Sequence, residues 1–200
     1  MSPRTYQLGQ RQDAVDQNRA RIIEAARDLL SAEEGVSRFT IDAVSRRADV
    51  ARMTVYYQFG SRVGLLEALC DWLAAEGGIE QLRDVFMAPP EASLTRLIEV
   101  FCTFWASNRL VMRRLFGMAA IDPEFAQVMD ARQQRRRHAV DAVLRRLQSD
   151  QSPERAVLQA DLLVMLTSFQ TYDSLDTTER TPVKVAVLID QLARAALSIV

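Results

Sequence analysis

The segment Val50–Arg62, VARMTVYYQFGSR, gathers side chains that can recognise another molecule through hydrogen bonds. Arg52 offers two parallel N–H donors that match the acceptor edge of a guanine, and Met53 can contact a thymine methyl group. Three long, uncharged side chains that can reach phosphates follow: Tyr56, Tyr57 and Gln58. On a helix, these five residues form its exposed face. The chemistry predicted is contact with the base edges and backbone of duplex DNA.

The local charge supports this prediction. Between residues 36 and 62 there are five arginines and two aspartates, an excess of three positive charges, although the whole chain has a net charge of −1. Thr40 and Arg62 stand at expected helix starts, where backbone N–H groups attract phosphate. The alternative interpretation is that Tyr56 and Tyr57 are half-buried aromatics and that the arginines form a solvated face.

Two short helices must position these side chains. The first starts at Thr40, a plausible N-cap, and the second spans residues 51–59, after a break at Asp49-Val50. Gly60 ends it and Ser61 caps a fourth helix, which stops at Gly77-Gly78. A preceding helix is expected over residues 16–34, with Gly35 at its C′ position. Residues 40–59 therefore predict a helix-turn-helix, whose second helix enters the major groove of DNA.

Residues 19–70 resemble the N-terminal domain of the TetR family of bacterial transcriptional regulators. The matching stretches are RIIEAARDLLSAEEG and TIDAVSRRADVARMTVYYQFGSRVGLLEAL. Asp49 stands where relatives usually have a glycine with positive φ, which Asp adopts at a cost of roughly 1 kcal/mol. Gln58 stands where His is common, Arg62 replaces a usual Lys, and Gly64 replaces a frequent Glu.

The resemblance implies a set of DNA-contacting residues in this chain: Thr40, Arg52, Met53, Thr54, Tyr56, Tyr57, Gln58 and Arg62. The N-terminal segment 2–13, with Arg4 and Arg11, is either a minor-groove arm or a frayed terminus.

The second half of the chain reads as longer, more apolar helices. They are expected over residues 94–105, 110–118, 123–147, 153–169 and 182–199. The predicted fold is all-α with about nine helices. Residues 1–62 form the arm and the helix-turn-helix domain, and residues 63–200 form a helical ligand-binding and dimerisation domain.

Most Phe and Met residues lie after residue 90, and the family resemblance implies a ligand pocket among these helices. The pocket predicted for a small apolar or aromatic effector is lined by seven residues: Phe101, Trp105, Phe116, Met129, Met165, Phe169 and Tyr172. The alternative is that they are ordinary core residues. Polar candidates for the same pocket are Asn108, Gln133, His138, Thr167 and Asp173.

An arginine run, RQQRRRH at 132–138, allows two interpretations. It is either a second anion-binding site or, more commonly, a solvated face paired with neighbouring carboxylates such as Asp130 and Asp141.

The last two helices are apolar on more than one face, which predicts a homodimer through a four-helix bundle. A two-fold dimer requires an inverted-repeat operator. The function predicted is a cytoplasmic, ligand-responsive transcriptional regulator, a repressor released from DNA by its effector.

The alternatives are a helical architectural DNA-binding protein without a ligand, or a helical-bundle enzyme using His138, Asp161 or Cys102. The chain has one His, no HExxH and no Gly-rich phosphate loop, so we expect no enzyme, metal or cofactor. Two cysteines are too few for a disulfide scaffold. No apolar run has the length of a membrane span, and the N-terminus lacks a signal-peptide core.

Overall fold

The computed structural model describes residues 3–33, 35–147, 152–176 and 179–199, with side chains from Ala14 to Ser198. The described residues form ten α-helices and two short 3-10 helices, without a strand. The all-α prediction is confirmed, and the expected count of about nine helices is one short. Within the described residues, no helix is long and apolar enough to cross a membrane. The chain divides into two compact units, described separately below.

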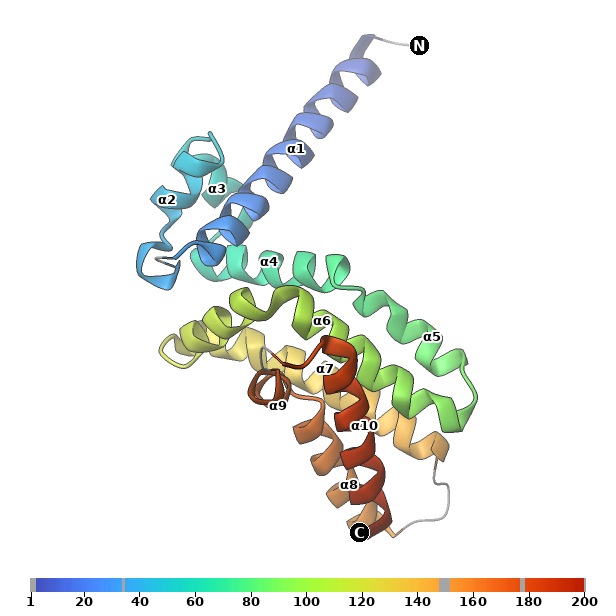
Figure 1. The fold of residues 1–200 in the computed structure, drawn as a ribbon. Helices are drawn as coiled ribbons and strands as arrows, with labels where there is room; N and C mark the ends of the chain where they lie inside the picture. The colour runs from blue at the N-terminus through green and yellow to red at the C-terminus, as the bar shows by residue number, and fades with distance from the viewer. Residues whose placement is uncertain (1–2, 34, 148–151, 177–178, 200) are drawn as a thin grey trace. The chain divides into compact units, whose positions relative to one another are not determined.

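The first unit consists of Met1–Trp72 together with Arg113–Ala126. It contains α1 (Pro3–Ser31), α2 (Ile41–Arg47), α3 (Arg52–Phe59) and the beginning of α4 (Arg62–Glu76). Figure 1 shows the two short helices α2 and α3 beside the C-terminal part of α1. Its apolar core draws on each of these helices: Ile22, Ala26, Leu30, Val44, Val55, Leu65 and Leu66 are all fully buried or nearly so.

Local signals fix the ends of these helices as predicted. The Thr40 hydroxyl accepts a hydrogen bond from the Ala43 N–H at 3.1 Å and so caps α2. The Ser61 hydroxyl does the same for α4 by accepting from the Gly64 N–H at 3.0 Å. Asp49, in the turn between α2 and α3, has a φ of 53°, the left-handed conformation expected for this position.

Gly35 has a different role from the one expected. α1 ends at Ser31, so Gly35 is not its C′ residue but begins the 3-10 helix η1 (Gly35–Arg38) with a φ of 47°. The Arg114 guanidinium caps the end of α1 by donating to the carbonyls of Leu30 and Ala32, and to that of Glu33 at 3.2 Å. A Cβ at Gly35 would lie 2.5 Å from Arg114 Cζ, so glycine leaves the space this arginine fills.

The second unit consists of Leu73–Met112 and Gln127–Val200. It contains η2 (Ile79–Gln81), α5 (Leu82–Met87), most of α6 (Pro90–Ala119) and of α7 (Pro123–Leu147), and then α8 (Pro153–Leu166), α9 (Phe169–Leu175) and α10 (Pro182–Ile199). Figure 1 shows α8 and α10 running side by side.

Two helix boundaries in this half differ from the prediction. The expected helices 94–105 and 110–118 are one continuous helix, α6, in which the buried Asn108 side-chain amide donates to the Phe104 carbonyl at 3.1 Å. The expected helix 153–169 instead ends at Leu166. The Thr167 hydroxyl donates a hydrogen bond to the Leu163 carbonyl. The Ser168 hydroxyl caps a separate helix, α9, by accepting a hydrogen bond from the Thr171 N–H.

Candidate functional site

The exposed face of α3 carries the most solvent-exposed large side chains of the helix-turn-helix. Tyr57 is 86 % exposed and Met53 is 72 % exposed. Val55, on the opposite face, is buried and anchors α3 to the core. Tyr56, Thr54 and Gln58 are half-buried at the edges of the exposed face. Both Tyr57 and Met53 are therefore accessible to a molecule outside the unit.

Arg52, at the start of α3, is held in position by two neighbours. Its guanidinium lies 3.1 Å from the Asp42 carboxylate of α2 and donates to the Tyr56 hydroxyl at 3.3 Å, one helical turn away. The hydrogen bond to Tyr56 and the charge of Asp42 raise the pKa of Arg52, in that order. These contacts are exposed, so they order the guanidinium without burying it.

Gln58 is bound to α1. Its amide donates to the Val15 carbonyl at 3.2 Å, and its own carbonyl accepts from Arg19 at 3.1 Å. Arg19 also lies over the Phe59 ring, 4.5 Å from its centroid. Gln58 thus joins the end of α3 to α1. Arg4 and Arg11 of the proposed arm fall outside the described side chains, although the backbone of α1 begins at Pro3.

Thr40 and Arg62, the two residues predicted to contact phosphate at helix starts, have different hydrogen-bond and ion-pair partners in the structure. The Thr40 hydroxyl is used as the cap of α2, and the residue remains exposed. Arg62 forms an ion pair with Asp122 at 3.0 Å and lies over the Phe39 ring. The other Asp122 oxygen accepts from the Phe125 N–H at 3.2 Å and so caps α7. Sequence reasoning missed Asp42 and Asp122; Asp122 directly precedes the helix-starting Pro123, but no pattern predicts a partner 60 residues away.

Three of the predicted pocket residues form an aromatic cluster in the second unit. The rings of Phe101 and Trp105 on α6 lie 6.3 Å apart, and those of Trp105 and Phe169 on α9 lie 5.6 Å apart, edge to face. The Trp105 indole donates to the Thr167 carbonyl at 3.1 Å. Met129 and Tyr172 are also buried in this unit.

The other two predicted pocket residues lie elsewhere. Met165 is 54 % exposed on α8, and Phe116 belongs to the first unit, where it is half-buried. A separate surface groove of about 610 Å³ runs between α5, α6 and α10, with Asp84, Glu99 and Val187 among its lining. None of the seven predicted pocket residues lines that groove.

Two reactive side chains in this core are held in their neutral forms. Burial, and then the charge of Asp176, raises the pKa of Tyr172 to about 12, and its buried hydroxyl has no hydrogen-bond partner among the described residues. Burial, and then Glu99, raises the pKa of Cys102 to about 12. Cys70 and Cys102 are both buried thiols outside any disulfide. A thiol that stays protonated is a poor nucleophile, so Cys102 acts as a small core residue.

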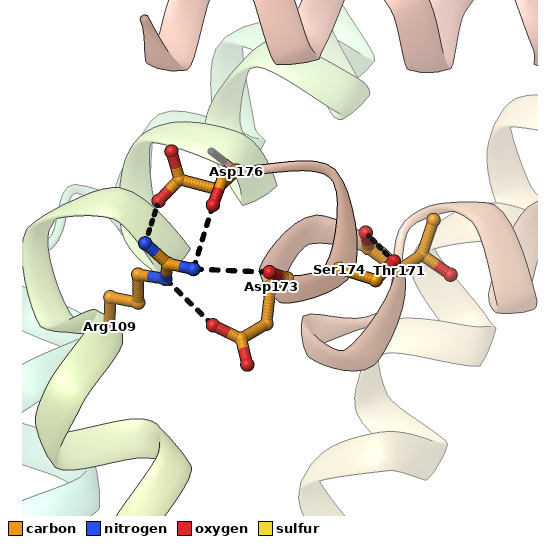
Figure 2. A network of polar contacts seen from close by, with 5 residues as sticks. All are labelled: Arg109, Thr171, Asp173, Ser174 and Asp176. Carbon is orange, nitrogen blue, oxygen red and sulfur yellow. Dashed lines mark hydrogen bonds and ion pairs between the residues drawn. The ribbon is translucent and has the colours of Figure 1, made fainter. Parts of the chain in front are cut away.

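Arg109 fixes α9 against α6 (Figure 2). Its Nε donates to the Asp173 carboxylate at 2.7 Å, Nη1 pairs with the Asp176 carboxylate at 2.8 Å, and Nη2 donates to both backbone carbonyls. Asp173 lies in α9 and Asp176 directly follows its last residue, and their negative charges compensate the guanidinium directly. Asp173, a polar pocket candidate, is thus used for structure, while the candidate His138 is exposed on α7.

Arg136 on α7 has a very different environment. It is 6 % exposed, so this member of the 132–138 run is not on a solvated face as the commoner interpretation had it. Its Nη1 donates to the Val164 carbonyl and, at 2.9 Å, to the Thr167 hydroxyl, and its Nε donates to Gln133 at 3.1 Å. All three acceptors are uncharged. Its neighbour Arg137 pairs with Asp161 at 2.6 Å, not with Asp130 or Asp141.

The charge of Arg136 is only weakly compensated. Burial lowers the pKa of Arg136 to about 10. The carbonyls at the C-terminus of α8 offer a cation roughly 0.3–1 kcal/mol, and up to about 2 kcal/mol in partly buried sites. Removing an ion from water costs several kcal/mol even after the protein relaxes. The helix C-terminus alone therefore does not offset the desolvation of this charge, and the rest of its compensation comes from hydrogen bonds to uncharged acceptors.

Residues 22–69 match the model of "Bacterial regulatory proteins, tetR family". This stretch covers α2, α3 and the turn between them, so it includes the whole exposed face described above. Over this stretch the chain is similar to the TetR family. The resemblance stated from the sequence is confirmed over residues 22–69, where α2 and α3 form the helix-turn-helix.

The chain is also similar to the HTH-type transcriptional regulator EthR of Mycolicibacterium smegmatis. It is 26 % identical over 114 residues, which are 56 % of this chain and 52 % of EthR. The match thus spans about half the length of that relative.

Solved structures extend the likeness to the whole fold. A TetR transcription regulator from Haloarcula marismortui superposes with a TM-score of 0.70 at 20 % identity, over 92 % of this chain and 97 % of that one. A regulator from Aquifex aeolicus gives 0.67 at 13 % identity, over 89 % and 98 %. At these identities the likeness establishes the shared helical fold alone.

Proposed function

We propose that this protein is a DNA-binding transcriptional regulator of the TetR family whose α3 helix reads the major groove. The observation that carries the proposal is the exposure of Tyr57 and Met53 on the second helix of a helix-turn-helix. Arg52, ordered by Asp42 and Tyr56, stands beside them as a donor for a guanine edge or a phosphate. Thr40, Thr54, Tyr56, Gln58 and Arg62 complete the proposed contact set.

The proposal is tested with a duplex that contains the protein's own promoter. Fluorescence anisotropy at low ionic strength measures the affinity of the wild type and of Met53→Ala. Met87→Ala is the matched control, because Met87 is also a methionine, 81 % exposed, but lies on α5 in the second unit. We expect Met53→Ala to weaken binding several-fold and Met87→Ala to leave it unchanged. If all three proteins bound the promoter duplex with equal affinity, the proposal that α3 contacts the DNA bases would be wrong.

The proposed regulator is a homodimer joined through α8 and α10. Both helices expose apolar side chains in the single chain: Val157, Leu158, Met165, Val183, Val187 and Leu192. These exposed apolar side chains support an interaction surface on the two helices, and α8 and α10 pack beside each other, as two helices of a four-helix bundle must. A two-fold dimer places two α3 helices about 34–36 Å apart, so the operator is proposed to be an inverted repeat.

The second part of the proposal concerns how a bound effector changes DNA affinity. We propose that a small molecule bound in the second unit, near the Phe101–Trp105–Phe169 cluster, lowers DNA affinity, so that the protein acts as a repressor. α4 contributes residues to both units, which makes it the proposed route of the signal. Couplings of this type are worth about 1–3 kcal/mol, or 5–150-fold in affinity. A cytoplasmic location, expected from the sequence, belongs to the same proposal.

A further inference from the structure

The most unusual charge in the second unit is that of Arg136. Within the part of the chain that the structure describes, it is 6 % exposed and has only uncharged hydrogen-bond partners. Its Nη2 group donates to none of those residues. Arg109, by contrast, is more exposed and has two carboxylates. A largely buried guanidinium that has no counter-charge among the described residues, and whose Nη2 is not used by the three acceptors, can bind an anion supplied by a ligand.

The surroundings of Arg136 indicate what kind of anion fits. Arg136 donates to the Thr167 hydroxyl, and the Trp105 indole donates to the carbonyl of the same residue. The guanidinium and the aromatic cluster therefore converge on Thr167, at the break between α8 and α9. A ligand reaching both needs a negatively charged group at one end and an apolar body at the other.

We propose that Arg136 is the counter-ion of an acidic effector, a small apolar or aromatic molecule with one carboxylate. The inference rests on the proposed function and specifies the chemical class of its effector. The carboxylate pairs with the guanidinium through Nη2, and the body lies against Trp105 and Phe169. Because Phe101, Trp105 and Phe169 are all buried, the ligand must part them to enter. Ligand entry is thereby coupled to a displacement of α6 from α9.

A structural role for Arg136 as a cap of α8 is the competing explanation. Capping carbonyls would stabilise the free protein, and the side chain would have no preference among ligands. An unpaired buried charge instead destabilises the free protein, since replacing it with an apolar side chain of similar volume removes the free-energy cost of desolvating the charge. The two explanations therefore predict opposite changes in the stability of the ligand-free protein.

The test compares acids with neutral amides of the same shape on the full-length protein. Octanoate, cyclohexanecarboxylate and phenylacetate are titrated against octanamide, cyclohexanecarboxamide and phenylacetamide, by thermal shift and calorimetry. We expect at least one acid to bind at least tenfold more tightly than its amide and to release the promoter duplex. In Arg136→Met the acid-to-amide ratio should fall to about one, and the Tm of the free protein should stay equal or rise.

Two further variants complete the test. Arg137→Met is the matched control, since Arg137 is the next residue and already pairs with Asp161, and it should keep the wild-type ratio. Arg136→Lys keeps the charge and should retain part of the preference, which also covers the case in which Arg136→Met does not fold.

The inference is overturned if no acid raises the wild-type Tm at millimolar concentration, or if Arg136→Met keeps the wild-type ratio with a lowered Tm. Promoter binding by the same wild-type sample, measured in parallel, tests separately whether the protein is a DNA-binding regulator.

Discussion

Asp122→Asn separates the two roles of Asp122 and tests how Arg62 is used. The carboxylate pairs with Arg62 at 3.0 Å and caps α7 by accepting from the Phe125 N–H. Asparagine keeps the cap, since Asn and Asp are equally good N-caps, but removes the ion pair. Arg62 and Asp122 are 37 % and 27 % exposed, and an ion pair exposed to this degree contributes up to about 1 kcal/mol. In the wild type this energy opposes any binding of Arg62 to phosphate.

We expect Asp122→Asn to lower the free energy of unfolding by up to about 1 kcal/mol and to raise DNA affinity by up to about fivefold. If Arg62 then neutralises one more phosphate, the slope of log K against log salt should steepen by about 0.9. Anisotropy titrations at several salt concentrations measure both the affinity and the slope. Asp161→Asn, which releases Arg137 from its ion pair in the second unit, is the control. An unchanged slope and affinity in Asp122→Asn would show that Arg62 does not exchange Asp122 for DNA.

Three smaller changes test the helix-turn-helix and the proposed dimer. Thr40→Ala removes the cap of α2 and should lower the free energy of unfolding in urea by about 1 kcal/mol; no change would mean that the cap is not formed. Gly64→Ala should destabilise, although Ala is the better helix former by about 1 kcal/mol, because its Cβ would lie 2.1 Å from the Phe59 carbonyl oxygen; an increase in stability would refute that close approach. Leu158→Glu puts a charge on the exposed apolar face of α8 and should shift sedimentation toward the monomer, whereas a persistent dimer would place the interface elsewhere.

The features that the sequence predicted correctly are local ones. The Thr40 cap, the stop at Gly60 and the left-handed Asp49 each depend on residues within one turn of the chain. The exposed positions of Met53 and Tyr57 follow from helical periodicity once Val55 is assigned to the core. These signals need no knowledge of the tertiary fold.

The features that the sequence did not predict depend on partners far along the chain. Arg62 pairs with a residue 60 positions away, and Arg114 reaches back more than 80 positions to cap α1. No periodic pattern encodes such pairs. The burial of Arg136 is of the same kind, since an arginine run typically indicates a solvated face and only the packing of α7 against the end of α8 buries this member.

The central claim, that α3 of a paired molecule reads DNA, is tested most directly by the affinity of the wild type and of Tyr57→Ala for a duplex of its own promoter. The account predicts tight, salt-dependent binding by the wild type and a loss of at least tenfold in the variant, because the 86 % exposed ring of Tyr57 has no structural role to lose. A wild-type protein that ignores this duplex at low ionic strength, or a Tyr57→Ala protein that binds equally well, would contradict the account.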